Sequence, residues 1–381
     1  MDTQTPPTKT RKRLLSIDGG GLAGLIPAES LILIEKQLDD LTESPQPLCD
    51  RFDLIGGTST GAILAAGLAL GLSAKELRDF YLNHGREIFT RSLLPVQLWH
   101  KYPSGPLEKK LKEVLGQDTT LGSDRLRTTI LIVTKNATAG STWFFTNNRN
   151  GRFFQRDTAL PLWQVVRAST AAPTYFPPQK IAIPDDTGQK QTYEFIDGGV
   201  SSYNNASFQV FLEATTPQYG FGWPTGTTNL LLLSLGTGYN PITIAEGKAA
   251  DYNLLCWARY LVKELMADAN LQQNMLMHLI GERPPKAQLA AAMNLSSVQA
   301  GTPSEDALNR VAAGLGTNKL LTYQRITISL TRERLETLGL GDIDPVKVRE
   351  LDAADQIENL RRIGEKVAQE QVDMKTLMHF F

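Results

Sequence analysis

The stretch FDLIGGTSTGAILAAGLAL, residues 52–70, is the part of the chain that decides its fold. An apolar run at 52–55 leads into Gly57-Thr58-Ser59-Thr60-Gly61, and the small apolar residues at 62–70 predict a helix. A strand, a sharp turn and a helix form the setting in which the pattern G-x-S-x-G presents a nucleophilic serine. Glycines are needed there because a Cβ on either side of the turn would collide with the neighbouring strand or helix.

Ser59 is predicted to lie at the N-terminus of that helix. Unpaired backbone N–H groups and the helix dipole favour negative charge at such a position, which suits a serine that attacks an acyl carbon. The pattern alone is moderately specific, because Gly- and Ser-rich turns are common between a strand and a helix. A tight turn with a purely structural role is therefore the alternative.

The composition excludes several classes of protein. The chain has 381 residues, of which 41% are apolar and 21% charged, and its formal net charge is −1. These values are ordinary for a soluble globular protein and give no indication of a nucleic-acid partner. Cys49 and Cys256 form no disulfide framework, which fits a reducing compartment. No His/Cys/Asp spacing predicts a metal site, so we expect neither a metal nor a cofactor. We also expect a cytoplasmic location with peripheral contact to membranes.

Three segments are expected along the chain. Residues 1–10 are polar and rich in Pro and Thr, and we expect a disordered leader because the apolar run that follows is too short for a signal peptide. Residues 11–240 alternate predicted strands and helices, which indicates an α/β core with a mostly parallel sheet. Residues 241–381 are mainly helical, and we expect them to pack on the same sheet. The charge-free stretch at 54–74 is long enough to span a membrane, but it contains the Gly/Ser/Thr turn, so a buried strand and helix are expected instead.

A second glycine-rich segment, Asp18-Gly19-Gly20-Gly21-Leu22-Ala23-Gly24, directly follows the first predicted strand. Its backbone N–H groups can point into one concave anion site. One interpretation is a dinucleotide site, since Gly19, Gly21 and Gly24 match G-x-G-x-x-G, although Asp18 would then lie beside a pyrophosphate. The favoured interpretation is an oxyanion hole for the reaction of Ser59, in which amides of this loop stabilise the negative oxygen.

A nucleophilic serine also needs a base. Histidine is the usual choice, but none of the four histidines, His84, His100, His278 and His379, lies at a strand end flanked by glycine. Asp197 does, because Asp197-Gly198-Gly199 ends a predicted strand, and a partly desolvated carboxylate there is basic enough to accept a serine proton. The alternative is that Asp197 only caps a turn.

Several strings occur in an order that resembles one known family. They are DGGGLAGLIPA (18–28), GTSTGAILA (57–65), RASTAAPTYFPP (167–178), FIDGGV (195–200) and LLLSLGTG (231–238). Together they resemble the patatin-like phospholipases from about Leu14 to Gly238, and the C-terminal helical part resembles plant patatins more weakly.

The resemblance implies a patatin fold, with a mostly parallel sheet sandwiched by helices. It also implies a Ser–Asp dyad without histidine: Ser59 as nucleophile, Asp197 as base, and Gly19, Gly20 and Gly21 as the oxyanion loop. The implied activity is calcium-independent hydrolysis of lipid acyl esters, of phospholipase A and lysophospholipase type, on phospholipid at a membrane surface. Two positions depart from the family pattern: Ala23 replaces a frequent Arg or Lys, and residues 201–206 are longer than usual and lack a proline. The rigidity of the segment after Asp197 is therefore an open point.

Two alternatives to a constitutive phospholipase stay open. The same enzyme can be an effector of bacterial antiphage defence that a cyclic nucleotide activates, or the chain can be a non-catalytic, lipid-binding patatin scaffold. Access to lipid requires an apolar surface, for which the loop with Trp99 and Tyr102 is a candidate. The methionines at 266, 275 and 277 are a weaker candidate, because core packing explains them better.

Overall fold

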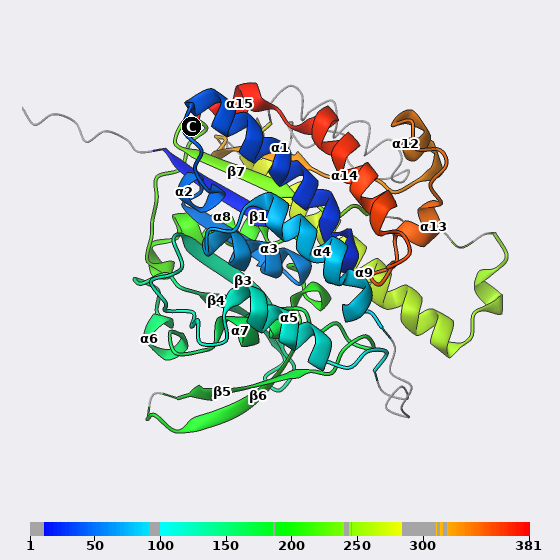
Figure 1. Cartoon of the computed structure of the whole chain (residues 1–381), viewed down its shortest axis with the longest axis horizontal. Coiled ribbons are helices and arrows are strands. Elements are labelled where there is room, and N and C mark those ends of the chain that lie inside the picture. The colour runs from blue at the N-terminus through cyan, green and yellow to red at the C-terminus, as the bar shows by residue number, and fades with distance from the viewer. Residues whose placement is uncertain are drawn as a thin grey trace, which may run out of the picture.

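One sheet runs through the middle of the molecule, with helices on both of its faces (Figure 1). This computed structural model describes residues 11–90, 100–185, 187–239, 244, 246–283, 310, 313–314 and 318–381. The predicted leader at 1–10 and Trp99 lie outside the described residues. Within them, the strands are β1 (Lys12–Ile17), β2 (Leu54–Thr58), β3 (Thr129–Asn136), β4 (Ser141–Thr146), β5 (Gln179–Pro184), β6 (Lys190–Asp197), β7 (Leu230–Leu235), β8 (Gly281–Glu282) and β9 (Leu321–Ile326).

The described strands form a nine-stranded sheet in the order β5-β6-β3-β2-β1-β7-β9-β8, with β4 paired to β3. The central strands β3, β2, β1, β7 and β9 are parallel, and β8 is parallel to β9. Strands β4, β5 and β6 are antiparallel to their neighbours. The expected mostly parallel sheet is therefore confirmed, with an antiparallel extension at one end.

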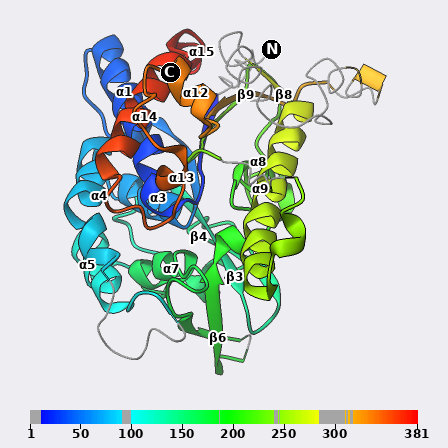
Figure 2. The ribbon, with the colours of Figure 1, turned by 90° about the vertical axis from the view of Figure 1, so that its right-hand side faces the viewer.

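The helices are arranged as two layers around this sheet. Their bounds are α1 (Leu25–Thr42), α2 (Leu48–Arg51), α3 (Thr60–Ala69), α4 (Ala74–Ile88), α5 (Gly105–Leu115), α6 (Phe154–Asp157), α7 (Leu162–Ser169), α8 (Ser207–Thr215), α9 (Leu254–Ile280), α12 (Arg332–Thr337), α13 (Pro345–Val348), α14 (Ile357–Gln371) and α15 (Met374–Met378). Because side chains alternate along a strand, Leu15 and Ile17 of β1 join the core under α1, α3 and α14, whereas Leu14 joins the smaller core under α8 and α9. Figure 2 shows these layers from the side.

The C-terminal part contributes more than helices. Helix α14 packs on α1 so closely that a Cβ on Gly364 would lie 3.0 Å from the Cα of Ile26. Helices α9, α14 and α15 supply the helical character expected of residues 241–381. Strand β9, which sequence analysis does not predict, pairs with β7 along its length, so residues beyond 240 complete the central sheet.

A local sequence signal marks the start of α4. Ser73 is the N-cap of α4, and it forms a capping box in which Ser73 and Glu76 each bond the other's backbone N–H. Tyr102, by contrast, is no exposed lipid contact: it is 4% exposed and packs edge-on against Phe89. Among the described residues, no helix combines the length and apolar character that crossing a bilayer requires.

Candidate active site

Ser59 lies in a strained turn between β2 and α3. Its φ is 55°, in the left-handed region that residues with a side chain rarely adopt. A Cβ on Gly57 would lie 2.2 Å from the carbonyl oxygen of Gly61, and a Cβ on Gly61 would lie 2.1 Å from that of Ile17 in β1. The predicted steric need for both glycines is therefore confirmed. The N–H of Ser59 donates to Oγ of Ser169 at 2.8 Å, a bond that holds the turn in place.

Asp197 reaches Ser59 through the register of the sheet. Thr58, the last residue of β2, pairs with Val133 of β3, and Asp197 pairs with the next residue, Thr134. Because β6 runs antiparallel to β3, the last residue of β6 pairs with β3 next to the position where β2 ends. The hydroxyl of Ser59 donates to Oδ2 of Asp197 at 2.6 Å. Both side chains are nearly inaccessible, at 9% and 5% exposure.

The surroundings of Asp197 make it a stronger base than an ordinary carboxylate. Burial raises the pKa of Asp197 to about 6, although the hydrogen bonds from Ser59 and from the N–H of Gly199 and the charge of Arg167 oppose the shift. Arg167 is fully buried in α7, and burial lowers its pKa to about 10, so it is a cation at neutral pH. In the sequence, the signal for Arg167 is its place at the start of RASTAAPTYFPP.

No histidine takes the position of a base. All four histidines lie in the described part of the chain, and none of them forms a hydrogen bond with Ser59. His84 lies 3.7 Å from Glu87 on α4. His278 is buried in α9, and burial lowers its pKa to about 3, so its ring is neutral. The chemistry available to Ser59 is therefore that of the carboxylate.

The glycine loop lies directly against Ser59. A Cβ on Gly19 would lie 3.1 Å from the Cβ of Ser59, and one on Gly20 would overlap the side chain of Thr237. The N–H of Gly19 donates to the carbonyl of Asn204 at 3.2 Å. The amides of Gly20 and Gly21 have no acceptor among the described residues, and Gly21 has a φ of 59°. The amides with capacity to bind an anion are thus those of Gly20 and Gly21, while Gly19 forms the contact with the neighbouring loop.

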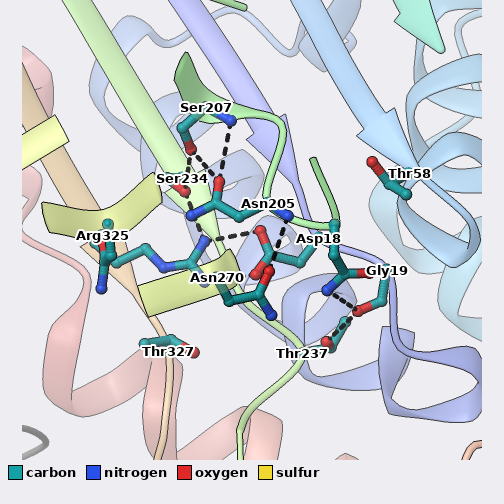
Figure 3. A network of polar contacts seen from close by, with 12 residues as sticks. Asp18, Gly19, Thr58, Asn205, Ser207, Ser234, Thr237, Asn270, Arg325 and Thr327 are labelled. Atoms are coloured by element: carbon teal, nitrogen blue, oxygen red, sulfur yellow. Dashed lines mark hydrogen bonds and ion pairs between the residues drawn. The ribbon is translucent and has the colours of Figure 1, made fainter. Parts of the chain in front are cut away.

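The segment after Asp197 is bonded to the end of β2 and to the glycine loop. The hydroxyl of Thr58 donates to the carbonyl of Tyr203 at 2.7 Å, and Nδ2 of Asn204 donates to the carbonyl of Gly19 at 3.3 Å. Thr237 Oγ1 donates to the same carbonyl at 2.6 Å (Figure 3). Asn204 and Asn205 were not assigned roles from the sequence. The bonds of Thr58 and Asn204 connect the segment that lacks the family's proline to β2 and to the glycine loop.

Comparison with known proteins gives a consistent result. A family model described as patatin-like phospholipase matches residues 15–208. Patatin-17 of Solanum cardiophyllum is 30% identical over 272 residues, which cover 67% of this chain and 68% of that protein. A cGAMP-activated phospholipase of Escherichia coli (strain TW11681) is 31% identical over 285 residues, covering 71% and 76%. A protein named probable inactive patatin-3-Kuras 1, of Solanum tuberosum, is 30% identical over 259 residues, covering 64% and 68%.

Proposed function

This chain belongs to the patatin-like phospholipase family, and from that premise we propose that it hydrolyses the carboxylic esters of glycerophospholipids. The activity is of phospholipase A or lysophospholipase type and needs no calcium. One observation carries the proposal: the hydroxyl of Ser59, on a strained turn, donates a 2.6 Å hydrogen bond to the buried carboxylate of Asp197.

The proposed reaction has two steps. Oγ of Ser59 attacks the acyl carbon while its proton moves to Asp197, and the tetrahedral intermediate expels the alcohol, which takes that proton. Asp197 then accepts a proton from water, the resulting hydroxide attacks the acyl-serine, and the fatty acid leaves as Ser59 regains its proton. The amides of Gly20 and Gly21 stabilise the negative oxygen in both steps, and losing one such donor typically costs about 3–4 kcal/mol of transition-state stabilisation.

Lipid mass spectrometry tests the proposal directly. Vesicles of mixed phospholipids are incubated with the protein in the presence of a calcium chelator, and free fatty acids and lysophospholipids are quantified. We expect both products, and we expect a fluorophosphonate probe to label Ser59, identified by peptide mass. Intact lipids together with an unlabelled Ser59 would contradict the proposal.

The activity is expected to fall as the pH falls through about 6. The pKa of Asp197 is raised to about 6, and a protonated carboxyl cannot accept the serine proton, so the active form exists above that pH. We expect kcat/KM to decrease about tenfold per pH unit below it. Initial rates on a non-ionising soluble ester measure this, with unfolding followed at each pH as the control. A rate that stays level down to pH of about 4 would exclude Asp197 as the base.

We propose that the substrate is reached at a membrane surface through α9. Leu254, Leu261 and Leu265 are 87%, 52% and 66% exposed, and their spacing places them on one face of the helix. Figure 2 shows α9 along one side of the molecule. The helix also meets the site, since the terminal methyl group of Met266 would lie 3.3 Å from a Cβ on Gly199. The methionine nearest the sheet, Met277, is fully buried and belongs to the core.

Replacing both Leu261 and Leu265 by aspartate is expected to lower hydrolysis of vesicle lipid about tenfold or more. Burying one leucine contributes roughly 1.5–3 kcal/mol, and 1.4 kcal/mol is tenfold in binding. Hydrolysis of a soluble short-chain ester should stay unchanged. Leu41→Asp, at a leucine that is 50% exposed on α1, is the matched control and should alter neither rate. Equal losses on vesicles and on the soluble ester would count against this surface.

A switched enzyme is the second candidate function. The observation that favours it is the 31% identity to a cGAMP-activated phospholipase over 71% of this chain. In that case the purified protein is silent on vesicles until a cyclic di- or trinucleotide is added, as in an effector of antiphage defence. Rates measured with and without a panel of cyclic nucleotides distinguish the two, because a constitutive enzyme is indifferent to all of them.

A non-catalytic, lipid-binding scaffold is the remaining alternative, and one relative is named as probably inactive. The hydrogen bond between Ser59 and Asp197 weighs against it in this chain. The scaffold predicts vesicle binding without any fatty-acid release, whether or not nucleotide is present.

A further inference from the structure

The sheet face under α8 and α9 changes from apolar to polar beside the candidate active site. On β1 the side chains on this face are Leu14, Ser16 and then Asp18, which directly follows the strand. The neighbouring strands change at the same level, since Ser16 pairs with Ser234 of β7 and Ser234 pairs with Arg325 of β9. A buried polar cluster of this kind is costly unless its members bond one another.

Arg325 and Asp18 form the centre of this cluster (Figure 3). Nη1 of Arg325 donates to Oδ1 of Asp18 at 2.8 Å, and Nη2 donates to Oδ2. The two side chains are 10% and 3% exposed. This is the bidentate geometry in which arginine and carboxylate bond most strongly. Burial raises the pKa of Asp18, and the charge of Arg325 opposes that shift, so the arginine favours the ionised form of the carboxyl.

The pair lies at the base of the glycine loop. Gly19, Gly20 and Gly21 have no side chains with which to pack, so contacts around them must hold their backbone. On one side Leu22 N–H donates to the carbonyl of Leu351 at 3.0 Å. On the other side the residue that precedes the loop is Asp18, whose side chain is fixed by Arg325.

The same arginine is connected to the segment after Asp197. Nη1 of Arg325 also donates to Oγ of Ser234 at 2.7 Å, and that hydroxyl lies 2.7 Å from Oγ of Ser207. Ser207 at the start of α8 bonds Oδ1 of Asn205 through both its N–H, at 3.0 Å, and its hydroxyl, at 2.6 Å. One buried cation is thus bonded directly to Asp18 at the base of the glycine loop and, through Ser234 and Ser207, is connected to Asn205 in the segment after Asp197.

We propose that Arg325 is a positioning residue, which acts through Asp18 to hold the amides of Gly20 and Gly21 toward the oxygen that becomes negative during ester cleavage. This inference rests on the proposed function. Arg325 lies outside residues 15–208, which the family model matches, on a strand that the C-terminal part adds to the sheet. The C-terminal part therefore supplies a determinant of the catalytic rate as well as covering the core.

The test compares Arg325→Lys, Asp18→Asn and the double variant. Lysine keeps the charge but loses the two-pronged contact. We expect Arg325→Lys to lower kcat about 10- to 100-fold with KM within about twofold, because misplaced donors weaken binding of the transition state rather than of the substrate. Affinity for a trifluoromethyl ketone, which forms an oxyanion on Ser59, should fall in parallel with kcat/KM. The double variant should be no slower than Asp18→Asn alone, since the arginine acts through that residue.

Arg51→Lys is the matched control. Arg51 is also buried and paired, with Nη2 at 2.6 Å from Asp39, but it lies just before β2, at the opposite end of that strand from Ser59. Its replacement should change kcat less than about twofold. Thermal unfolding of each variant checks the fold.

Three results would overturn the inference: an unchanged kcat in Arg325→Lys, a loss of rate that follows only the unfolded fraction, or additive losses in the double variant. The rate at which a fluorophosphonate labels Ser59 provides a second readout, because the phosphonyl oxygen needs the same donors. If the wild-type protein is labelled at Ser59 but releases no fatty acid, the proposed substrate is wrong, and the labelling rates of the variants still decide the role of Arg325.

Discussion

Replacing Ser59 by alanine is expected to lower fatty-acid release from phospholipid vesicles by about 10³- to 10⁶-fold. The loss is this large because the hydroxyl oxygen forms the bond to the acyl carbon, so no part of the two-step path survives its removal. Binding of the substrate should persist, since the variant keeps the glycine loop and the apolar face of α9. The measurement is lipid mass spectrometry of vesicles incubated with each protein, together with vesicle co-sedimentation.

Two further variants make this result interpretable. Ser44→Ala, at an exposed serine after α1, is the matched control and should release fatty acid at the wild-type rate. Ser59→Gly should be as inactive as Ser59→Ala but more stable by about 1 kcal/mol, because glycine tolerates the positive φ at this position. Release by Ser59→Ala at the wild-type rate would show that another group is the nucleophile.

Replacing Asp197 by asparagine is expected to lower kcat/KM by about 10³- to 10⁴-fold. Asparagine has nearly the same shape and can still accept a hydrogen bond from Ser59, but it cannot take up the proton. The rate on a soluble ester measures the loss. The residual rate should no longer depend on pH near 6, because the group that titrates there is absent.

The same substitution is expected to stabilise the fold at neutral pH. The folded-state pKa of Asp197 is raised from 3.8 to about 6, so the native protein binds this proton more tightly than the unfolded chain does. Stability therefore decreases as the pH rises from about 4 to about 6, and above that the buried charge costs roughly 3 kcal/mol. Asparagine removes the cost, so urea unfolding at pH of about 7.5 should show a gain that disappears at pH of about 4.

Asp157→Asn is the matched control for this experiment. Asp157 is also buried, and burial also raises its pKa, but it is paired with Arg156 at 2.6 Å and lies in α6. Its raised pKa predicts a gain of the same sign, but its replacement also removes this partner of Arg156, so we expect a smaller gain in stability and no loss of activity. A destabilised Asp197→Asn would mean that the hydrogen bonds of the carboxylate outweigh the cost of its burial.

The parts of the site that follow from local sterics could be predicted from the sequence. Gly57 is required by the turn itself, because a Cβ there would meet the carbonyl oxygen of Gly61, whereas Gly61 is required by the close approach of Ile17 in β1. The strand at Leu230–Leu235 reads LLLLSL, an almost entirely apolar run, so its existence follows from hydrophobicity. Ser73 caps α4 through an interaction that spans only a few residues. The deciding contacts of Gly57 and of Ser73 are close in sequence, so the local pattern contains them.

The features that depend on distant segments could not be obtained in this way. Strand β9 lies inside the sheet, between β7 and β8, and nearly all of its residues are buried. Its sequence therefore lacks the regular alternation of apolar and polar residues that marks a half-buried strand. Tyr102 could have been an exposed lipid contact or a core residue, and only its packing against Phe89 settles which. The sequence does not distinguish the amide of Gly19 from those of Gly20 and Gly21 as an oxyanion donor. Only the structure shows that the Gly19 N–H already donates to the carbonyl of Asn204.

The sequence by itself determined the family and the fold class and indicated Ser59 and Asp197 as candidates, since ordered motifs and local backbone requirements express them. The tertiary structure decided how those residues relate to one another. The register of β6 on β3 brings Asp197 to Ser59, burial raises its pKa, and β9 brings Arg325 beneath the glycine loop. The physical reason is that hydrogen-bond register and desolvation arise from contacts between segments far apart in the sequence, such as Thr134 with Asp197 and Asp18 with Arg325, which no local pattern records.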